Sequence, residues 1–145
     1  MQAEDAILEG LTARTRNLLR ALDRQDRLET ATVFADWLSR QGSAELATAA
    51  QEVFLRALGA ASDPINFQLL KLLDPLSAAS LPDLMEATGL ERIAVSERLN
   101  DLVQVGLVSR ELIDDQIRCT DLATGLVAWV EGMAQRSGEQ LLEDL

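Results

Sequence analysis

The feature that most constrains the fold is a pair of short helices at a tight turn, within residues 63–121. Ser80 is suited to cap the first helix, whose opening turn contains Pro82, because proline is tolerated where its missing N–H is not needed. Gly89 can end this helix, since glycine readily takes the left-handed conformation that helix ends favour. A second helix is then predicted from about residue 91 to residue 105, with apolar side chains spaced by three and four.

Two short apolar segments follow the helix pair. They cover residues 107–112 and 116–120, and Asp114 and Asp115 lie between them as turn residues. An opening helix, a helix pair and a hairpin, in this order, are typical of a winged helix-turn-helix. We therefore expect a mainly α protein, with a short β-hairpin wing, an N-terminal helical extension and a C-terminal helix.

Three segments of this region resemble the winged-helix domain of ArsR-type bacterial transcription regulators, with MarR-type regulators as looser relatives. The opening helix of that family, which begins DPTR, corresponds to DPINFQLLKLL at residues 63–73. Its support helix and turn correspond to LPDLMEATGL at residues 81–90. Its recognition-helix pattern VSxHLxxLxxAGLV corresponds without a gap to VSERLNDLVQVGLV at residues 95–108. The resemblance covers roughly residues 61–125, and it implies a regulator that binds duplex DNA.

The rest of the chain is expected to be helical on both sides of this domain. The three expected regions are an N-terminal helical region at 1–62, the winged helix-turn-helix at 63–121, and a C-terminal helix with an acidic tail at 122–145. Either Thr120 or Asp121 is suited to cap the C-terminal helix.

Three helices are predicted in the N-terminal region. The first is amphipathic and covers residues 3–22, and the polar segment 23–26 should bend or break it. The second is predicted to end near residue 40, and Ser43 is suited to cap the third.

Apolar side chains on the flanking helices suggest a dimer. ArsR-type proteins commonly dimerise through the helices beside the winged core, so the resemblance implies a homodimer, which also suits two DNA half-sites. The expected interface residues are Leu8, Leu11, Leu18, Leu22, Leu126, Trp129 and Met133. The alternative is that these helices only close the core of their own chain.

The resemblance also indicates which side chains would contact DNA. They are Arg92, Ser96 and Arg98 on the recognition helix, with Arg110 and Arg118 on the hairpin. Arginines could reach guanine edges or phosphates, and the serine could donate to a phosphate oxygen. This chain departs from the family pattern at Glu91 and Glu97 and at the hairpin tip, where Asp114 and Asp115 would face phosphates unfavourably.

The charge balance opens a second hypothesis. The chain has a formal net charge of −11, and residues 63–125 alone hold 5 basic and 11 acidic side chains. DNA-binding proteins gain much of their affinity by neutralising phosphates. We therefore expect weak or conditional DNA binding. The alternative is a protein-interaction module that has lost DNA binding and presents an acidic face to a protein partner.

A row of arginines lies on the first helix and beyond it. If the helix is continuous, Arg16, Arg20, Arg24 and Arg27 share one side, at spacings of four, four and three. They form either a solvated face that pairs with nearby carboxylates or a docking strip for phosphate or an acidic partner.

The residue types also argue against several functions. The chain has no histidine and one cysteine, so neither family type of metal site, on cysteines or on histidine, is expected. Cys119 is expected to be a small packed side chain. No catalytic constellation, cofactor motif, membrane-spanning run or signal peptide is recognisable, so we expect a cytoplasmic protein that is not an enzyme.

Overall fold

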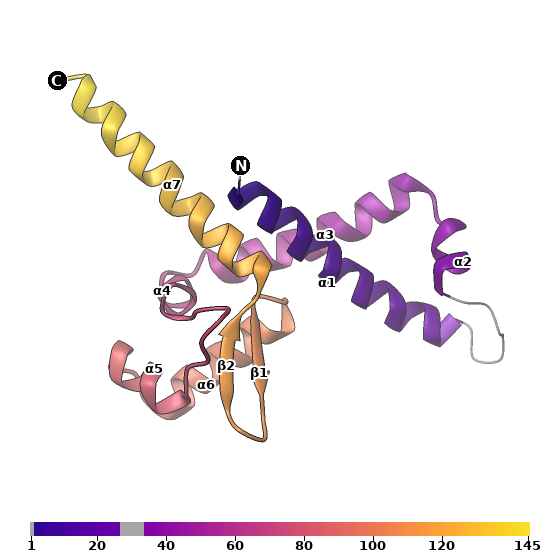
Figure 1. Ribbon diagram of the computed structural model, residues 1–145, viewed down its shortest axis with the longest axis horizontal. Helices are drawn as coiled ribbons and strands as arrows, with labels where there is room; N and C mark the ends of the chain where they lie inside the picture. Colours follow the sequence, from indigo (N-terminus) through magenta and orange to yellow (C-terminus); the bar gives the residue numbers. More distant parts are fainter. Residues whose placement is uncertain (1, 27–33) are drawn as a thin grey trace.

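The structure is a computed structural model that describes residues 2–26 and 34–145. Within these residues the chain is mainly helical with a two-stranded antiparallel hairpin, which confirms the expectation of a mainly α protein with a short hairpin. Figure 1 shows α4, α5, α6 and the hairpin on one side of the long helices α1, α3 and α7. In chain order the elements are α1 (Gln2–Asp26), α2 (Phe34–Ser39), α3 (Ser43–Ala61), α4 (Pro64–Leu72), α5 (Leu81–Thr88), α6 (Arg92–Gln104), β1 (Val108–Glu111), β2 (Gln116–Cys119) and α7 (Asp121–Glu143).

Helix ends around the predicted turn follow the expected capping chemistry. Ser80 Oγ accepts a hydrogen bond from the Asp83 amide at 3.3 Å, and the Asp83 carboxylate accepts one from the Ser80 amide at 3.1 Å. Gly89 follows α5 in the left-handed conformation, with φ at 72°. Thr120 caps α7 by accepting a hydrogen bond from the Ala123 amide. Local sequence signals are sufficient for these ends, since each cap acts within four residues.

Two predicted helix boundaries are wrong. The α1 helix continues through residues 23–26, where a bend or break was expected. This segment contains neither glycine nor proline, and its residues cost a helix only a few tenths of a kcal/mol each, up to about 0.7. The cap of α3 is Gly42 instead of Ser43, and no side chain makes a capping hydrogen bond there.

An isolated β-bridge attaches the hairpin to the segment just before α5. Strands β1 and β2 pair from Val108 opposite Cys119 to Glu111 opposite Gln116. Ala79, just before α5, exchanges two backbone hydrogen bonds of 2.9 Å with Ile117. These bonds hold β2 beside the segment that enters α5, so the hairpin and the helix pair form one body.

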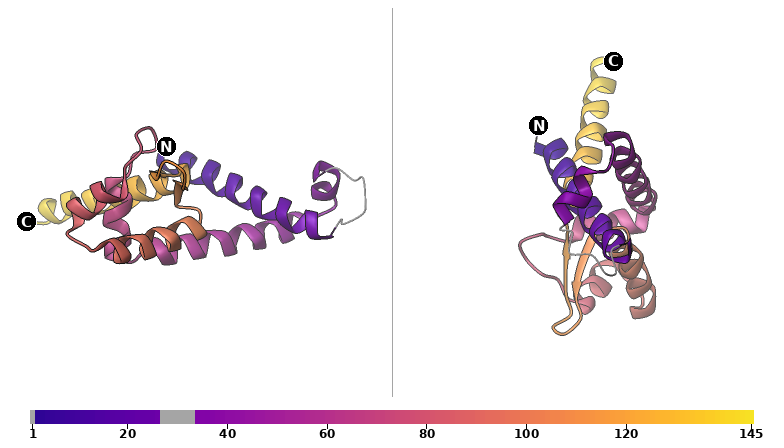
Figure 2. Two further views of the ribbon diagram at one scale, coloured as in Figure 1. Left: turned by 90° about the horizontal axis from the view of Figure 1, so that it is seen from below. Right: turned by 90° about the vertical axis from the view of Figure 1, so that its right-hand side faces the viewer.

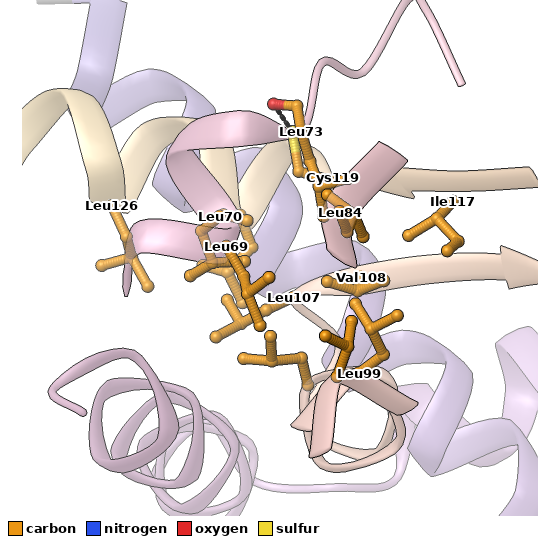
Figure 3. Packing of buried hydrophobic residues seen from close by; sticks show 14 of the residues in the cluster. Leu69, Leu70, Leu73, Leu84, Leu99, Leu107, Val108, Ile117, Cys119 and Leu126 are labelled. Carbon is orange, nitrogen blue, oxygen red and sulfur yellow. Dashed lines mark hydrogen bonds between the residues drawn. The ribbon is translucent and has the colours of Figure 1, made fainter. Parts of the chain in front are cut away.

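One apolar core joins this body to α7. Figure 3 shows Leu69 of α4, Leu84 of α5 and Leu99 of α6 packed beside the hairpin residues. Each of these three leucines is at most 2% exposed. Leu126 of α7 belongs to the same buried cluster. Roughly 2 kcal/mol of transfer free energy per fully buried leucine explains why these elements stay together.

Glycines allow α1 and α7 to cross very closely. A Cβ atom on Gly125 would lie 2.7 Å from the backbone nitrogen of Ile7, and a Cβ on Gly10 would clash with the backbone of Leu122. Backbone atoms at these distances cannot move aside as a flexible side chain can. Each helix therefore requires a glycine where it meets the other.

Replacing Gly125 with alanine should destabilise the protein by about 1–3 kcal/mol, because the added methyl group must separate α1 from α7. The matched change Gly132→Ala, on the same helix, meets nothing within 4 Å. It should stabilise the protein by about 0.5–1 kcal/mol, since alanine favours a helix over glycine. Urea unfolding followed by circular dichroism, at one protein concentration, measures both. Equal changes in the free energy of unfolding for the two variants, in the same direction, would contradict the close crossing.

Candidate nucleic-acid interface

The α6 helix divides into a buried face and an exposed face. Val95, Leu99 and Leu102 are completely buried, which turns the opposite side of the helix outward. The exposed side chains there include Arg92, Ile93, Glu97, Asn100, Asp101 and Gln104. This is the face that could enter a groove of DNA, since its three- and four-residue spacing places these side chains together.

Arg98 points to the start of α4. Its Nη1 donates to Asp63 Oδ1 at 2.8 Å and to Asn66 Oδ1 at 3.1 Å. The same Asp63 oxygen accepts hydrogen bonds from the amides of Ile65 and Asn66, at 2.9 and 3.1 Å. Arg98 therefore links α6 to the N-terminus of α4, and its charge is already balanced within the chain.

The pKa of the Asp63 carboxyl is held below its usual value. The hydrogen bond from the Asn66 amide is the largest cause, and the Ile65 amide and Arg98 lower it further against the opposing effect of burial. A helix N-terminus and an arginine both stabilise the charged carboxylate.

Arg110 connects the hairpin to α6. Its Nε and Nη2 donate to Asp115 Oδ1 at 3.1 and 3.0 Å, and its Nη1 donates to Ser96 Oγ at 3.3 Å. The Arg110 side chain is only 13% exposed. Asp115 reaches this position with φ at 50°, a left-handed conformation that aspartate tolerates in turns. The structure thus brings Ser96 and Arg110 together. Arg110 is held by Asp115, whereas Ser96 only accepts a hydrogen bond here, so its hydroxyl can still donate.

Arg92 and Arg118 remain available for contacts. Both are exposed, and neither has an ion-pair partner among residues 2–26 and 34–145. Arg92 lies in the first turn of α6 and Arg118 lies on β2. Carboxylates share the surface of α6 and the hairpin with them, at Glu91, Glu97, Asp101, Glu111 and Asp114. Any polyanion that approached this surface would meet more negative charge than free positive charge.

The expected dimer residues differ in how far they are exposed. Leu126 is 1% exposed and packs in the core of its own chain, so its assignment to a dimer interface is corrected. Trp129 and Met133 are 43% and 48% exposed, and they lie farther along α7. Leu8 and Leu11 line a cavity between α1 and α3, whereas Leu18 lines a separate one with Glu52 and Arg56. The side chain of Leu22 lies outside the described part of the chain.

The arginine row is only partly described. The arginines share one side only if the helix is continuous, and α1 is continuous as far as Asp26. Arg16 and Arg20 are exposed on α1. The side chain of Arg24, and all of Arg27, lie outside the described residues.

Cys119 is buried and belongs to the core. Its Sγ lies 3.3 Å from the Leu73 carbonyl oxygen, to which it donates, and 3.3 Å from Thr124 Oγ1. Burial is the main cause that raises the pKa of this thiol, so it stays protonated and unreactive at neutral pH. In the described part of the chain, no three His, Cys, Asp or Glu side chains gather as metal ligands would. None of the helices described is both long enough and apolar enough to cross a membrane.

Sequence reasoning missed the ion pairs that Asp63 and Asp115 make with two of the expected DNA-contacting arginines, Arg98 and Arg110. Asp63 was recognised only as the start of a helix, and Asp115 only as a turn residue whose charge would face phosphates unfavourably. Asp63 and Arg98 are 35 positions apart, so no local pattern relates them. Asp115 and Arg110 are five apart, and the ion pair depends on the left-handed turn conformation of Asp115 just before β2.

The comparisons with known proteins do not assign a family. A scan against protein-family models, a search of curated proteins and a search of solved structures each found no match for this chain.

Replacing Asp63 with alanine should lower the melting temperature at neutral pH, because α4 loses its cap and Arg98 loses its partner. The pKa of Asp63 is lowered in the folded state, so its stabilising effect is present above the unfolded value of 3.8 and is lost as the pH falls below it. The difference between the parent and Asp63→Ala should therefore shrink between pH 7 and pH 3. Thermal unfolding at each pH measures this.

The control for that experiment is Asp101→Ala on the exposed face of α6. The Asp101 carboxylate has no hydrogen-bond or ion-pair partner among the described residues. The melting temperature of Asp101→Ala should therefore change with pH as that of the parent does. An equal pH-dependent difference for both variants would contradict the role given to Asp63.

Proposed function

We propose that this chain is a winged helix-turn-helix transcription regulator, similar to the ArsR and MarR types, that binds duplex DNA weakly or conditionally. One observation carries the proposal: α6 keeps a whole face exposed beside the hairpin, and Arg110 ties the hairpin to Ser96 of α6. The helix and hairpin thus form a continuous surface, which suits a recognition helix with its wing. The element order from α4 to β2 supports the same reading.

The ion pairs explain why binding would be weak. Arg98 and Arg110, which the family resemblance places on DNA, are held by Asp63 and Asp115. A phosphate must compete with a carboxylate for each of them. With Arg92 and Arg118 as the free cations of this surface, few counterions would be released on binding. Binding would strengthen if either carboxylate were neutralised, because its arginine would then be free to bind a phosphate.

A homodimer is part of the proposal, and the shape of α7 supports it. Every α7 residue from 128 to 143 is exposed except Gly132, which is half-buried. Figure 1 shows this part of the helix projecting away from the rest of the chain. A helix of this length is only marginally stable alone in water. Trp129, Val130 and Met133 give it apolar area that a second copy could cover.

A protein-interaction module is the second candidate, and the charges of the same surface favour it. Ile93 is 70% exposed at the start of α6, and the exposed carboxylates Glu97, Asp101 and Asp114 belong to the same helix and hairpin. An exposed apolar side chain among carboxylates suits a basic protein partner better than a polyanion. Binding to DNA therefore decides between the two candidates.

The deciding experiment measures fluorescence anisotropy of a labelled duplex of arbitrary sequence at about 50 mM salt and above. The parent should bind with a salt dependence worth about two to four charges. Glu97→Lys should strengthen binding and steepen that dependence, since it adds a phosphate contact on α6. Asp115→Asn should also strengthen binding, because it releases Arg110 from its ion pair.

The matched control is Glu45→Lys, which makes the same charge change at the start of α3, away from α6 in Figure 1. It should strengthen binding far less than Glu97→Lys. Equal effects would mean that net charge, and not the α6 surface, governs binding. If neither the parent nor Glu97→Lys is retained on DNA, the regulator proposal is abandoned for the protein-interaction module.

The dimer is tested by sedimentation equilibrium at micromolar concentration, where the parent should be dimeric. Met133→Glu places a charge on the apolar face of α7 and should weaken the dimer by about tenfold or more. Gln135→Glu adds the same charge on the opposite side of the helix and should leave the dimer intact. A parent that sediments as a monomer contradicts the dimer, whatever its DNA binding.

A further inference from the structure

The end of α6 binds a side chain from a distant part of the chain. The amides of Val105, Gly106 and Leu107 donate to carbonyl oxygens earlier in α6, so the turn satisfies those groups with its own backbone. The carbonyl oxygen of Gln104 instead accepts a hydrogen bond from Arg14 Nη2, at 2.5 Å. Arg14 belongs to α1 and lies 90 positions earlier in the sequence. The last turn of α6 is therefore capped by α1.

The Arg14 side chain also lies against Gly106. A Cβ atom on this glycine would lie 2.7 Å from Arg14 Cδ and 2.9 Å from Arg14 Nε. Gly106 has φ at 83°, so the backbone of the turn favours glycine as well. The C-terminal end of a helix carries partial negative charge, which favours a guanidinium group at this place.

Two cavities border the Arg14 side chain. Their volumes are about 210 and 410 Å³. Val53 of α3 and Gln104 line the smaller one, whereas Ser109 of β1 and Asp121 of α7 line the larger one. Close packing normally fixes the distance between two elements through many contacts of each side chain. Where cavities remain, a single hydrogen-bonded side chain contributes a larger share of that restraint.

Arg14 holds the end of α6 that the ion pairs do not reach. Arg98 links the middle of α6 to the start of α4, and Arg110 links Ser96, in the first half of α6, to the hairpin. Arg14 links the last turn to α1, whose first half is packed on α7. The direction of the exposed α6 face relative to α1 and α7 therefore depends on Arg14.

We propose that Arg14 is a positioning residue for DNA binding, which contacts no nucleotide and fixes the end of α6 from which the hairpin continues. The inference rests on the proposed regulator function. A recognition helix and its wing must meet DNA in one orientation. If the end of α6 moves, only a fraction of the molecules present that orientation, and the apparent affinity falls by the same fraction.

The test compares Arg14→Met with Arg56→Met by fluorescence anisotropy of a labelled duplex at about 50 mM salt, well below the melting temperature of each variant. Arg56 of α3 lines the smaller cavity with Arg14 and has no hydrogen-bond or ion-pair partner in the described part of the chain. Its replacement removes the same charge from nearly the same place. Arg14→Met should weaken DNA binding about tenfold and Arg56→Met less than about twofold. Arg14→Lys can still donate to the Gln104 carbonyl, so it should restore part of the affinity.

Two further measurements exclude other roles for Arg14. The dependence of log affinity on log salt should be the same for Arg14→Met as for the parent, because the number of phosphate contacts does not change. Amide hydrogen exchange without DNA should be faster in Arg14→Met at residues 103–107. It should be unchanged beside Gly10 and Gly125, because the α1–α7 crossing is intact.

Three results would overturn the role of Arg14 and leave the regulator proposal standing. The first is equal affinity of Arg14→Met and Arg56→Met. The second is a salt dependence lower by about one charge in Arg14→Met, which would make Arg14 a phosphate contact. The third is faster exchange at the α1–α7 crossing as well, which would indicate a general loss of stability. A parent that does not bind DNA would instead end the regulator proposal, and this inference with it.

Discussion

The close crossing of α1 and α7 determines how the helices outside the hairpin body are arranged. Gly10 and Gly125 let the two backbones approach to a distance that any side chain would prevent. The first half of α1 is held on α7, and its second half runs beside α3 toward α2 (Figure 1 and Figure 2).

Ion pairs and hydrogen bonds also hold together the part of the chain from α4 to β2. One oxygen of Asp63 accepts two backbone amides and an arginine, so the start of α4 and the middle of α6 share a single anionic centre. In the hairpin, one oxygen of Asp115 accepts two hydrogen bonds from Arg110, which in turn reaches Ser96 of α6. Partly exposed ion pairs add little to stability, but each of them engages an arginine that could otherwise bind a phosphate. The arginine count of this surface thus overstates its attraction for phosphate.

Sequence reasoning predicted the elements well where the signal was local. The caps at Ser80 and Thr120 and the left-handed Gly89 each act within a few residues, and each is found where expected. It failed at residues 23–26, where polar residues were given the weight of a helix breaker although none is glycine or proline. The two glycines of the α1–α7 crossing were missed because a glycine inside a helix has the same local pattern whether it meets another backbone or solvent.

The sequence by itself determined the order of helices and strands, their caps and turns, and the apolar residues that could form a core. These depend on residues close together in the chain, whose preferences act before any tertiary contact forms. Only the tertiary structure decided which of the apolar residues are buried and which of the arginines are paired with a carboxylate. Leu126 and Met133 lie two helical turns apart on the same side of α7, yet the core of the chain buries Leu126 and leaves Met133 exposed. Arg92 and Arg98 lie on one helix, yet only Arg98 has a carboxylate from α4 beside it, because packing alone brings residues 35 positions apart into contact.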